Sequence, residues 1–174
     1  GSINPSHVLS YGMLGMHGSY WANHAASSAD VIIGLGMRMD DRALGRFEDM
    51  NPDAKIIHVD IDPAEHQKNI EAHVPIGNVK DVLVQLVDSV NTTTHPDWLK
   101  WINELRTNHK ESMSIPSGPE LSAQYAISRI AELIGPESVL CTGVGQHQMW
   151  AAQFGNISRP RQFITSGGLG TMGF

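Results

Sequence analysis

The sequence predicts an α/β protein built on doubly wound parallel sheets. Two short runs rich in β-branched residues, DVIIGLG at 30–36 and AKIIHVDID at 54–62, have the composition of strands buried on both faces. Two more strands are predicted at SVLCTGVG, 138–145, and RQFITSGG, 161–168, and both of these runs end in glycine. Helical patterns lie between the strands, and this alternation is typical of parallel sheets.

The helices are expected where apolar residues recur at helical spacing. They are predicted at 20–29, 63–72, 79–91, after Pro96, and from Ala123 to the Gly135-Pro136 pair. In the third of these, one buried face is predicted from Val79, Val82, Leu83, Leu86, Val87 and Val90. A short strand is also expected at 73–77.

The polar stretch at 109–118 interrupts these patterns and predicts a linker between two domains, 1–108 and 119–174. The first domain opens on a loop without a preceding strand. The second ends in the glycine-rich SGGLGTMGF, where a helix would normally follow. We therefore expect both domains to be incomplete and the chain to be a piece of a longer one.

Composition excludes several classes of function. The 174 residues hold 12 basic and 18 acidic side chains, a net charge of -6, and no basic stripe, which disfavours nucleic acid as a partner. No apolar run is long enough to span a membrane, and the start does not resemble a signal peptide. Cys141 is the single cysteine, which excludes an internal disulfide and is typical of a reducing compartment.

Two glycine-containing segments precede or follow predicted elements at places suited to ligands. GMLGMHGSYWAN at 12–23 leads into a helix, so its backbone N–H groups can face an anion, but a plain loop–helix junction explains it equally well. GLGMRMDDR at 34–42 follows a strand, and its four charges, at 38 and 40–42, suit either phosphate or carboxylate binding or a solvated loop.

Acids and a histidine follow the other strands. Asp60 is placed to contact a nucleotide ribose, whereas Asp62 stands before Pro63 and is expected to cap a helix. Gln146 and His147 follow a glycine turn, where the imidazole can donate to a phosphate, move a proton or serve a structural role. No lysine-bearing phosphate loop and no metal-ligand spacing of His or Cys is present.

Taken together, GMLGMHGSYWAN, GMRMDDR, HVDIDPAE, VGQHQMWAAQ and ITSGGLGTMGF resemble, in order and spacing, the catalytic large subunit of the acetolactate synthase (acetohydroxyacid synthase) family. This is a thiamine diphosphate-dependent family, and the resemblance covers nearly the whole chain. It implies a central, FAD-type domain at 1–108 and the beginning of the diphosphate-binding domain at 119–174.

The resemblance also implies an activity. Members decarboxylate pyruvate on thiamine diphosphate and join the two-carbon unit to pyruvate or 2-ketobutyrate, in the biosynthesis of isoleucine and valine. Mg²⁺ and a structural FAD are further expected cofactors. The expected partners are a second copy, in a homodimer or tetramer, and a small regulatory subunit. The expected location is the bacterial cytoplasm, or a plastid or mitochondrion in a eukaryote.

Site residues follow from the same resemblance, by position in the motifs. The flavin is expected to contact Gly15, Met16, His17, Gly18, Arg38, Asp60 and Ile61. The substrate channel is expected to contain Asp41, Arg42 and Met16. Thiamine diphosphate is expected to contact Gln146, His147, Gly170 and Met172.

Some family features are missing or altered. The activating glutamate and the Gly-Asp-Gly…Asn motif for Mg²⁺ are expected outside this segment, so no catalytic residue and no metal ligand is assigned within it. Gly143 stands where the family commonly has aspartate, and Asn78 stands in place of an acid near the flavin adenine. FAD binding is therefore a separate question from family membership.

Two alternatives remain open at this stage. The chain is also compatible with another thiamine diphosphate-dependent carboligase or decarboxylase, although GMHG and QHQMWAAQ argue against it. A non-catalytic nucleotide-binding module would explain the first domain but not GQHQMW or SGGLGTMGF.

Overall fold

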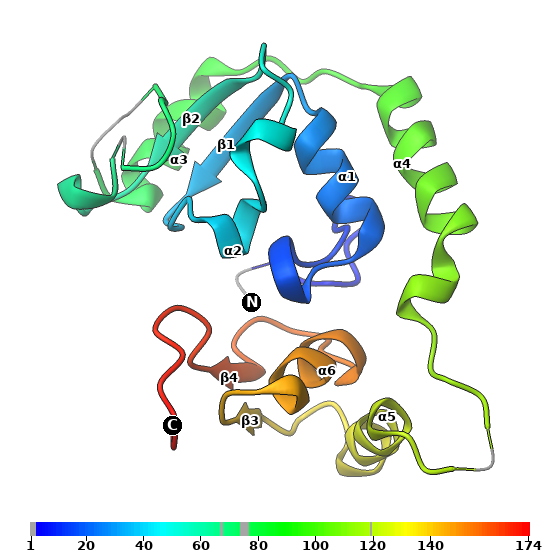
Figure 1. Cartoon of the computed structure of the whole chain (residues 1–174). Coiled ribbons are helices and arrows are strands. Elements are labelled where there is room, and N and C mark those ends of the chain that lie inside the picture. The colour runs from blue at the N-terminus through cyan, green and yellow to red at the C-terminus, as the bar shows by residue number, and fades with distance from the viewer. Residues whose placement is uncertain (1–2, 67, 74–76, 119) are drawn as a thin grey trace. The chain divides into compact units, whose positions relative to one another are not determined.

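The computed structural model describes residues 3–66, 68–73, 77–118 and 120–174, which form two compact units (Figure 1). The β1–β2 unit comprises residues 14–16 and 20–108, and the β3–β4 unit comprises residues 1–13, 17–19 and 109–174. The domain limits proposed from the sequence stay predictions. None of the helices in these ranges combines the length and apolar character that a membrane crossing requires.

The first unit is built on a parallel strand pair. β1 (Val31–Leu35) and β2 (Lys55–Val59) are hydrogen-bonded in parallel, with Val31 opposite Lys55 and Leu35 opposite Val59. Both strands lie within the segments predicted for them. The helices of this unit are α1 (Tyr20–Ser28), α2 (Asp41–Leu44), α3 (Val79–Ser89) and α4 (Pro96–Asn108). Of these, only the four-residue α2 was not expected from the sequence.

The core of this unit lies on one side of the strand pair. Met39, Met50 and Ile56 are buried together, and half-buried apolar side chains surround them: Ile32, Leu44, Phe47, Ile70 and Ala72. The other face of β1 is exposed, because no described segment of the unit covers it, and its apolar side chains are Val31, Ile33 and Leu35. The prediction of a strand buried on both faces is therefore wrong for β1.

The α3 helix confirms the predicted apolar stripe in part. Asn78 caps its start, since its side-chain Oδ1 accepts from the Lys80 N–H at 2.9 Å. The first four stripe residues are half-buried, whereas Val87 is 73% and Val90 is 60% exposed. Val90 lies beyond the helix in an extended conformation, so helical spacing no longer directs it to the stripe. Val87 lies beside the exposed Val84, on a face without a described partner.

The prediction of a helix at 63–72 is wrong. Among the described residues of this range, 63–66 and 68–72, only a 3₁₀ turn forms, η3 (Pro63–Glu65). The chain then returns to β2, where the His73 N–H donates to the Ile56 carbonyl at 2.7 Å and the His58 N–H donates to the His73 carbonyl at 3.0 Å. This pairing directs the backbone away from a helix. Of the strand predicted at 73–77, His73 forms an isolated bridge, and residues 74–76 lie outside the described residues.

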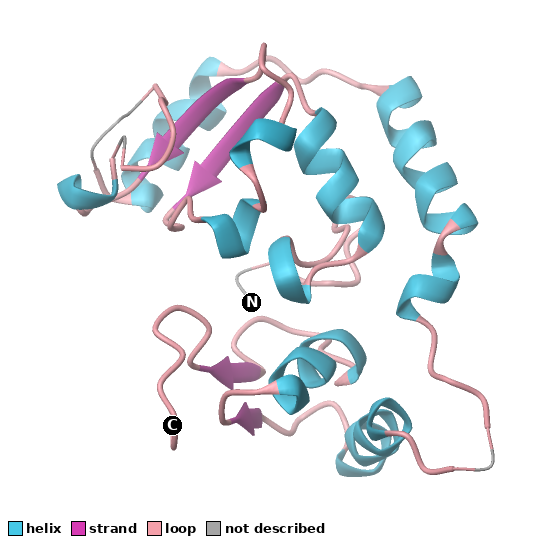
Figure 2. Ribbon diagram, in the orientation of Figure 1, coloured by secondary structure: helices cyan, strands magenta, loops and turns pink. Residues whose placement is uncertain are grey.

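The second unit repeats the parallel pairing on a smaller scale (Figure 2). β3 (Leu140–Thr142) and β4 (Phe163–Thr165) pair in parallel, with Leu140 opposite Phe163. The predicted α5 (Ala123–Ile134) packs against α6 (Gln146–Phe154), which was not predicted. Within the predicted linker the structure has a 3₁₀ turn, η4 (Lys110–Met113).

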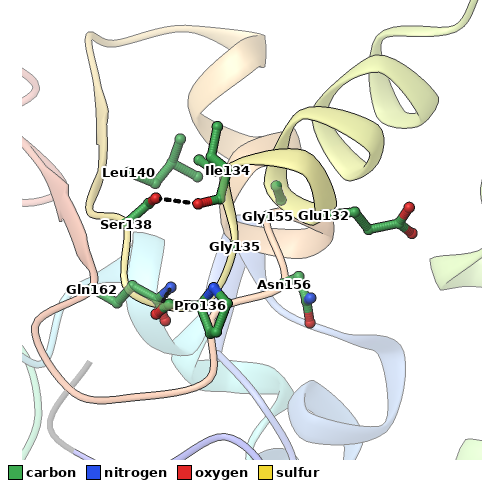
Figure 3. A pocket seen from close by; sticks show the side chains of 10 residues that line it. Glu132, Ile134, Gly135, Pro136, Ser138, Leu140, Gly155, Asn156 and Gln162 are labelled. Carbon is green, nitrogen blue, oxygen red and sulfur yellow. Dashed lines mark hydrogen bonds between the residues drawn. The ribbon is translucent and has the colours of Figure 1, made fainter.

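A polar network joins the loops that precede β3 and β4. The buried Gln162 side chain accepts from the Ser158 N–H at 2.9 Å and donates to the Pro136 carbonyl at 3.1 Å. The Arg159 guanidinium donates to the carbonyl of Glu137 at 2.6 Å. A pocket of about 220 Å³ lies beside this network, where the Ser138 hydroxyl donates to the Ile134 carbonyl at 2.6 Å (Figure 3). The amino edge of this strand pair is therefore held by satisfied polar groups.

Gly155, at the end of α6, gives a direct test of the packing in this unit. A Cβ atom there would lie 2.4 Å from the Ala151 carbonyl oxygen and 2.8 Å from Leu140 Cδ2. We expect Gly155→Ala to lower the free energy of unfolding by about 1–3 kcal/mol, because the helix must move away from β3. Gly118→Ala is the matched control, since a Cβ atom there meets nothing within 4 Å. Equal urea unfolding curves for the two variants would contradict the packing.

Candidate functional site

The first candidate site lies at the carboxyl edge of β1 and β2. Because the strands are parallel, the segments that follow them meet at one edge, and the Gly36 N–H donates to the Val59 carbonyl at 2.8 Å there. Arg38 follows β1 and Asp60 and Ile61 follow β2, so the structure brings these three predicted flavin residues to one edge. Such edges are the usual ligand sites of doubly wound sheets.

The two acids after β2 are both engaged by backbone N–H groups. Asp62 accepts from the Ala64 N–H at 2.9 Å, which confirms it as an N-cap, although of a 3₁₀ turn. The Asp60 carboxylate accepts from the Asp62 N–H at 2.9 Å. Its side chain is 14% exposed, whereas Ile61 is 69% exposed. Contact of Asp60 with a ligand stays a prediction.

His58 is a residue of this edge that sequence reasoning missed. It is 1% exposed, and its Nε2 lies 2.7 Å from the Met37 carbonyl oxygen. Because a carbonyl only accepts, the imidazole donates from Nε2 and holds the loop that carries Arg38 against β2. The available signal was a histidine inside an otherwise apolar strand.

Gly15, in the glycine loop at 12–18, packs against α2. Gly15 has a φ of +78°, and a Cβ atom there would lie only 1.9 Å from the Arg42 carbonyl oxygen. Only glycine fits this position, both for its conformation and for its close approach to another backbone. Asp40 caps α2 by accepting from the Ala43 N–H at 2.9 Å. Asp41 and Arg42 therefore stand in the first turn of this helix, both exposed.

An open cleft of about 390 Å³ lies between the loop, α1 and α2. Its lining residues are Gly15, Met16, Asn23, His24, Ser27, Asp41, Leu44, Gly45, Arg46 and Asp49. Two of the three residues predicted for the substrate channel, Met16 and Asp41, thus share one cleft. Within the described chain, Arg42 contributes its carbonyl to the back of the loop and does not line the cleft, and neither do Arg38, Asp60 and Ile61.

The remaining predicted residues of the loop, His17 and Gly18, follow Met16 in the sequence and do not line the cleft. His17 ends the 3₁₀ turn η1 (Gly15–His17), and Gly18 follows it. Both are half-buried. Burial lowers the pKa of His17 below its ordinary value of 6.5, because the charged imidazolium loses hydration.

The second candidate site lies at the carboxyl edge of β3 and β4. Gln146 and His147 form the first turn of α6 after β3, and both are exposed. After β4, the terminal loop folds back, with the Thr171 N–H donating to the Ser166 hydroxyl oxygen at 2.9 Å. Gly170 has a φ of +62°, and a Cβ atom there would lie 4.0 Å from Val144 Cγ1. The structure therefore brings Gln146, His147 and Gly170 together, and leaves Met172 76% exposed on the same loop.

The start of α6 suits an anion. Its N-cap is Gly145, which has no side chain to cap the helix, and no acid stands in the first turn, so the N-terminal N–H groups present a partial positive charge. Gln148, which sequence reasoning missed, is 4% exposed and donates to the Thr165 hydroxyl at 2.8 Å. That hydroxyl also pairs with Thr142 at 2.8 Å, so one network fixes both strand ends beneath the helix.

Comparison with known proteins gives two family matches. Residues 1–86 match the model of the thiamine pyrophosphate enzyme central domain, and residues 143–174 match that of the C-terminal thiamine pyrophosphate-binding domain. The chain belongs to the thiamine pyrophosphate enzyme family. The predicted fold class is confirmed: an α/β central domain followed by the start of a cofactor-binding domain.

Relatives within this family are acetolactate synthases. The chain is 46% identical to the acetolactate synthase of Mycobacterium leprae, covering 100% of this chain and 29% of the relative. It is 44% identical to the isozyme 1 large subunit of Escherichia coli K12, covering 31% of that protein, and 44% identical to the chloroplastic acetolactate synthase 1 of rice, covering 28%. The predicted resemblance is confirmed, and this member of the family spans under a third of the length of these relatives.

Gly15 tests the fit of the glycine loop. We expect Gly15→Ala to lower the free energy of unfolding by about 2 kcal/mol more than Gly12→Ala, because a methyl group at Gly15 overlaps the backbone of α2. Gly12 is a matched control, since its φ is also positive, at +94°, while its nearest contact would be 3.8 Å away. If denaturant unfolding shows the same loss of unfolding free energy in both variants, the positive φ alone, and not the contact with α2, requires glycine at position 15.

The half-buried His17 makes the free energy of unfolding depend on pH, and the direction of this dependence can be predicted. Because its folded pKa lies below 6.5, the unfolded chain binds the proton first as the pH falls. Stability is therefore full above 6.5 and declines until the pH passes the lowered folded value. We expect His17→Gln to lose less stability than the wild type between about pH 8 and pH 5. Parallel curves of unfolding free energy against pH would contradict burial of this imidazole.

Proposed function

We propose that the chain is part of the catalytic subunit of an acetolactate synthase, which condenses pyruvate with a second 2-keto acid, either pyruvate or 2-ketobutyrate. The observation that carries the proposal is the identity of 44–46% over the whole chain to proteins with this name from mycobacteria, Escherichia coli and rice. The acetolactate or acetohydroxybutyrate formed by this condensation leads toward the branched-chain amino acids.

The carboxyl edge of β3 and β4 is the proposed thiamine diphosphate site. When bound, this cofactor supplies an electron sink for decarboxylating a 2-keto acid and a carbon nucleophile for the second one. The chain fits it in two ways: the uncapped start of α6 would hold the diphosphate, and the backbone around Gly170 would support the pyrimidine. The exposed His147 imidazole would donate to a phosphate oxygen.

The carboxyl edge of β1 and β2, with the adjoining glycine loop, is the proposed flavin site. Arg38 would pair with a phosphate, and the backbone of residues 15–18 would lie against the flavin, where the close packing at Gly15 leaves no side chain in the way. Asn78, which replaces an acid here, still caps α3 through its Oδ1. The substitution therefore preserves the local fold, and we propose that FAD binding is retained.

The cleft at Met16 and Asp41 is the proposed entry for the acceptor 2-keto acid. Met16 offers an apolar contact to the acceptor's alkyl group. The exposed Arg42, next to the cleft, would attract the carboxylate. The chain thus binds and orients the acceptor, while Mg²⁺ and the group that activates the cofactor are proposed to lie in other parts of the subunit.

Partners and location follow from the relatives. The Escherichia coli relative is named a large subunit, and the rice relative is chloroplastic. We propose that this chain likewise acts within an oligomer of large subunits with a small subunit, in a bacterial cytoplasm or a plastid.

The activity is tested on the complete gene product that carries this chain. With thiamine diphosphate, Mg²⁺, FAD and pyruvate it should form acetolactate, and the 174-residue chain alone should form none. Carbon dioxide and acetaldehyde without acetolactate would instead identify a decarboxylase.

The cofactor site is tested by a pair of glycine variants. Gly170→Ala should raise the thiamine diphosphate concentration needed for half-maximal activity about tenfold, because the loop loses its left-handed turn. Gly135→Ala is the matched control, with a φ of +77° and no neighbour within 4 Å, at the amino edge. An equal effect of the two variants would contradict the proposed site.

A further inference from the structure

Asn23, on α1, is hydrogen-bonded twice to one residue of the glycine loop. Its Oδ1 accepts from the Gly15 N–H at 2.7 Å, and its Nδ2 donates to the Gly15 carbonyl at 3.1 Å. One hydrogen bond would leave the loop free to rotate about it, whereas two on the same residue fix both position and orientation.

Gly15 is confined from the other side as well. The carbonyl of Arg42 is so close that a Cβ atom on Gly15 would lie 1.9 Å from it. The backbone of Gly15 is thus held between the carboxamide of Asn23 and the backbone of α2. The loop cannot shift without breaking the Asn23 pair or moving that helix.

The next residue along the loop is Met16, which is 65% exposed and lines the cleft with Asp41. Met16 has a flexible side chain, so its place in the cleft depends on where its backbone is held. That backbone continues directly from the clamped Gly15.

We propose that Asn23 is a positioning residue, which fixes the Gly15 backbone and through it Met16, and that it thereby sets the discrimination between pyruvate and 2-ketobutyrate as acceptors. The acceptor half of this inference rests on the proposed function, whereas the clamp does not. The two acceptors differ by one methylene group, and an apolar site separates such ligands about 10- to 200-fold only when its walls are well placed.

The clamp is tested without any activity, by hydrogen exchange at the Gly15 amide. Asn23→Leu removes both hydrogen bonds, and the near-isosteric Asn23→Asp keeps the acceptor but sets a carboxylate against the Gly15 carbonyl. Exchange should be fastest in Asn23→Leu, intermediate in Asn23→Asp and slowest in the wild type. Unchanged exchange in both variants would overturn the clamp.

Asn51→Asp is the matched control. Asn51 also makes two backbone hydrogen bonds, donating to the Ala29 carbonyl at 3.2 Å and accepting from the Asp53 N–H at 3.0 Å, and it does not line the cleft. Its substitution should leave exchange at Gly15 unchanged. Equal acceleration by Asn51→Asp would mean that general loosening, and not the clamp, exposes the amide.

The role in specificity is tested by the product ratio of the complete protein, supplied with pyruvate and 2-ketobutyrate together. This ratio belongs to the active molecules and does not change when a fraction is unfolded. Asn23→Asp should change the ratio of acetohydroxybutyrate to acetolactate about threefold or more, and Asn51→Asp should not. A wild-type ratio in Asn23→Asp would overturn the specificity role. Absence of both products in the wild type would instead refute the proposed function, with the exchange result still deciding the clamp.

Discussion

Parallel pairing of short strands is the constraint on which the rest of the structure depends. In each unit it places the segments that follow two strands at one edge, although they are 20 or more residues apart in the sequence. Arg38 and Asp60 follow the paired strands of one unit, and His147 and Gly170 follow those of the other. At the opposite, amino edge of β3 and β4, Gln162 and Arg159 donate hydrogen bonds to the carbonyls of Pro136 and Glu137. The carboxyl edge of the same strands is the proposed ligand site, and its exposed residues include Gln146 and His147.

Close approach of two backbone segments shapes the cleft lined by Met16 and Asp41. Gly15 lies so close to the Arg42 carbonyl that a side chain at position 15 would overlap it. Two hydrogen bonds with Asn23 hold the Gly15 backbone in this place. The hydrogen bonds to Gly15 fix the backbone that leads into Met16, and a wall fixed in this way would suit the proposed acceptor site. Buried polar groups have the same role elsewhere: His58 holds the Arg38 loop, and Gln148 fixes the strand ends beneath α6. In each case a side chain determines where the backbone of a proposed binding site lies.

Local patterns explain which features could be predicted. The β-branched runs of β1 and β2 and the apolar stripe of α5 depend on nearby residues, and all three were found. The helix α6 was missed because its first turn is polar and its buried residues, Gln148 and Ala151, do not form an apolar stripe. The helix at 63–72 was overpredicted because a bridge from His73 to β2 overrides local preference. Asn23 and His58 were missed because their partners lie 8 and 21 residues away, a relation that no spacing rule encodes.

Binding of thiamine diphosphate at the carboxyl edge of β3 and β4 can be measured by hydrogen exchange on the complete gene product, with and without this cofactor and Mg²⁺. We expect slower exchange at residues 144–148 and 166–172, which hold the start of α6 and the terminal loop, and no change at the amino edge around Ser138 and Gln162. Protection at the amino edge, or none at either edge under conditions where binding is saturated, would contradict it.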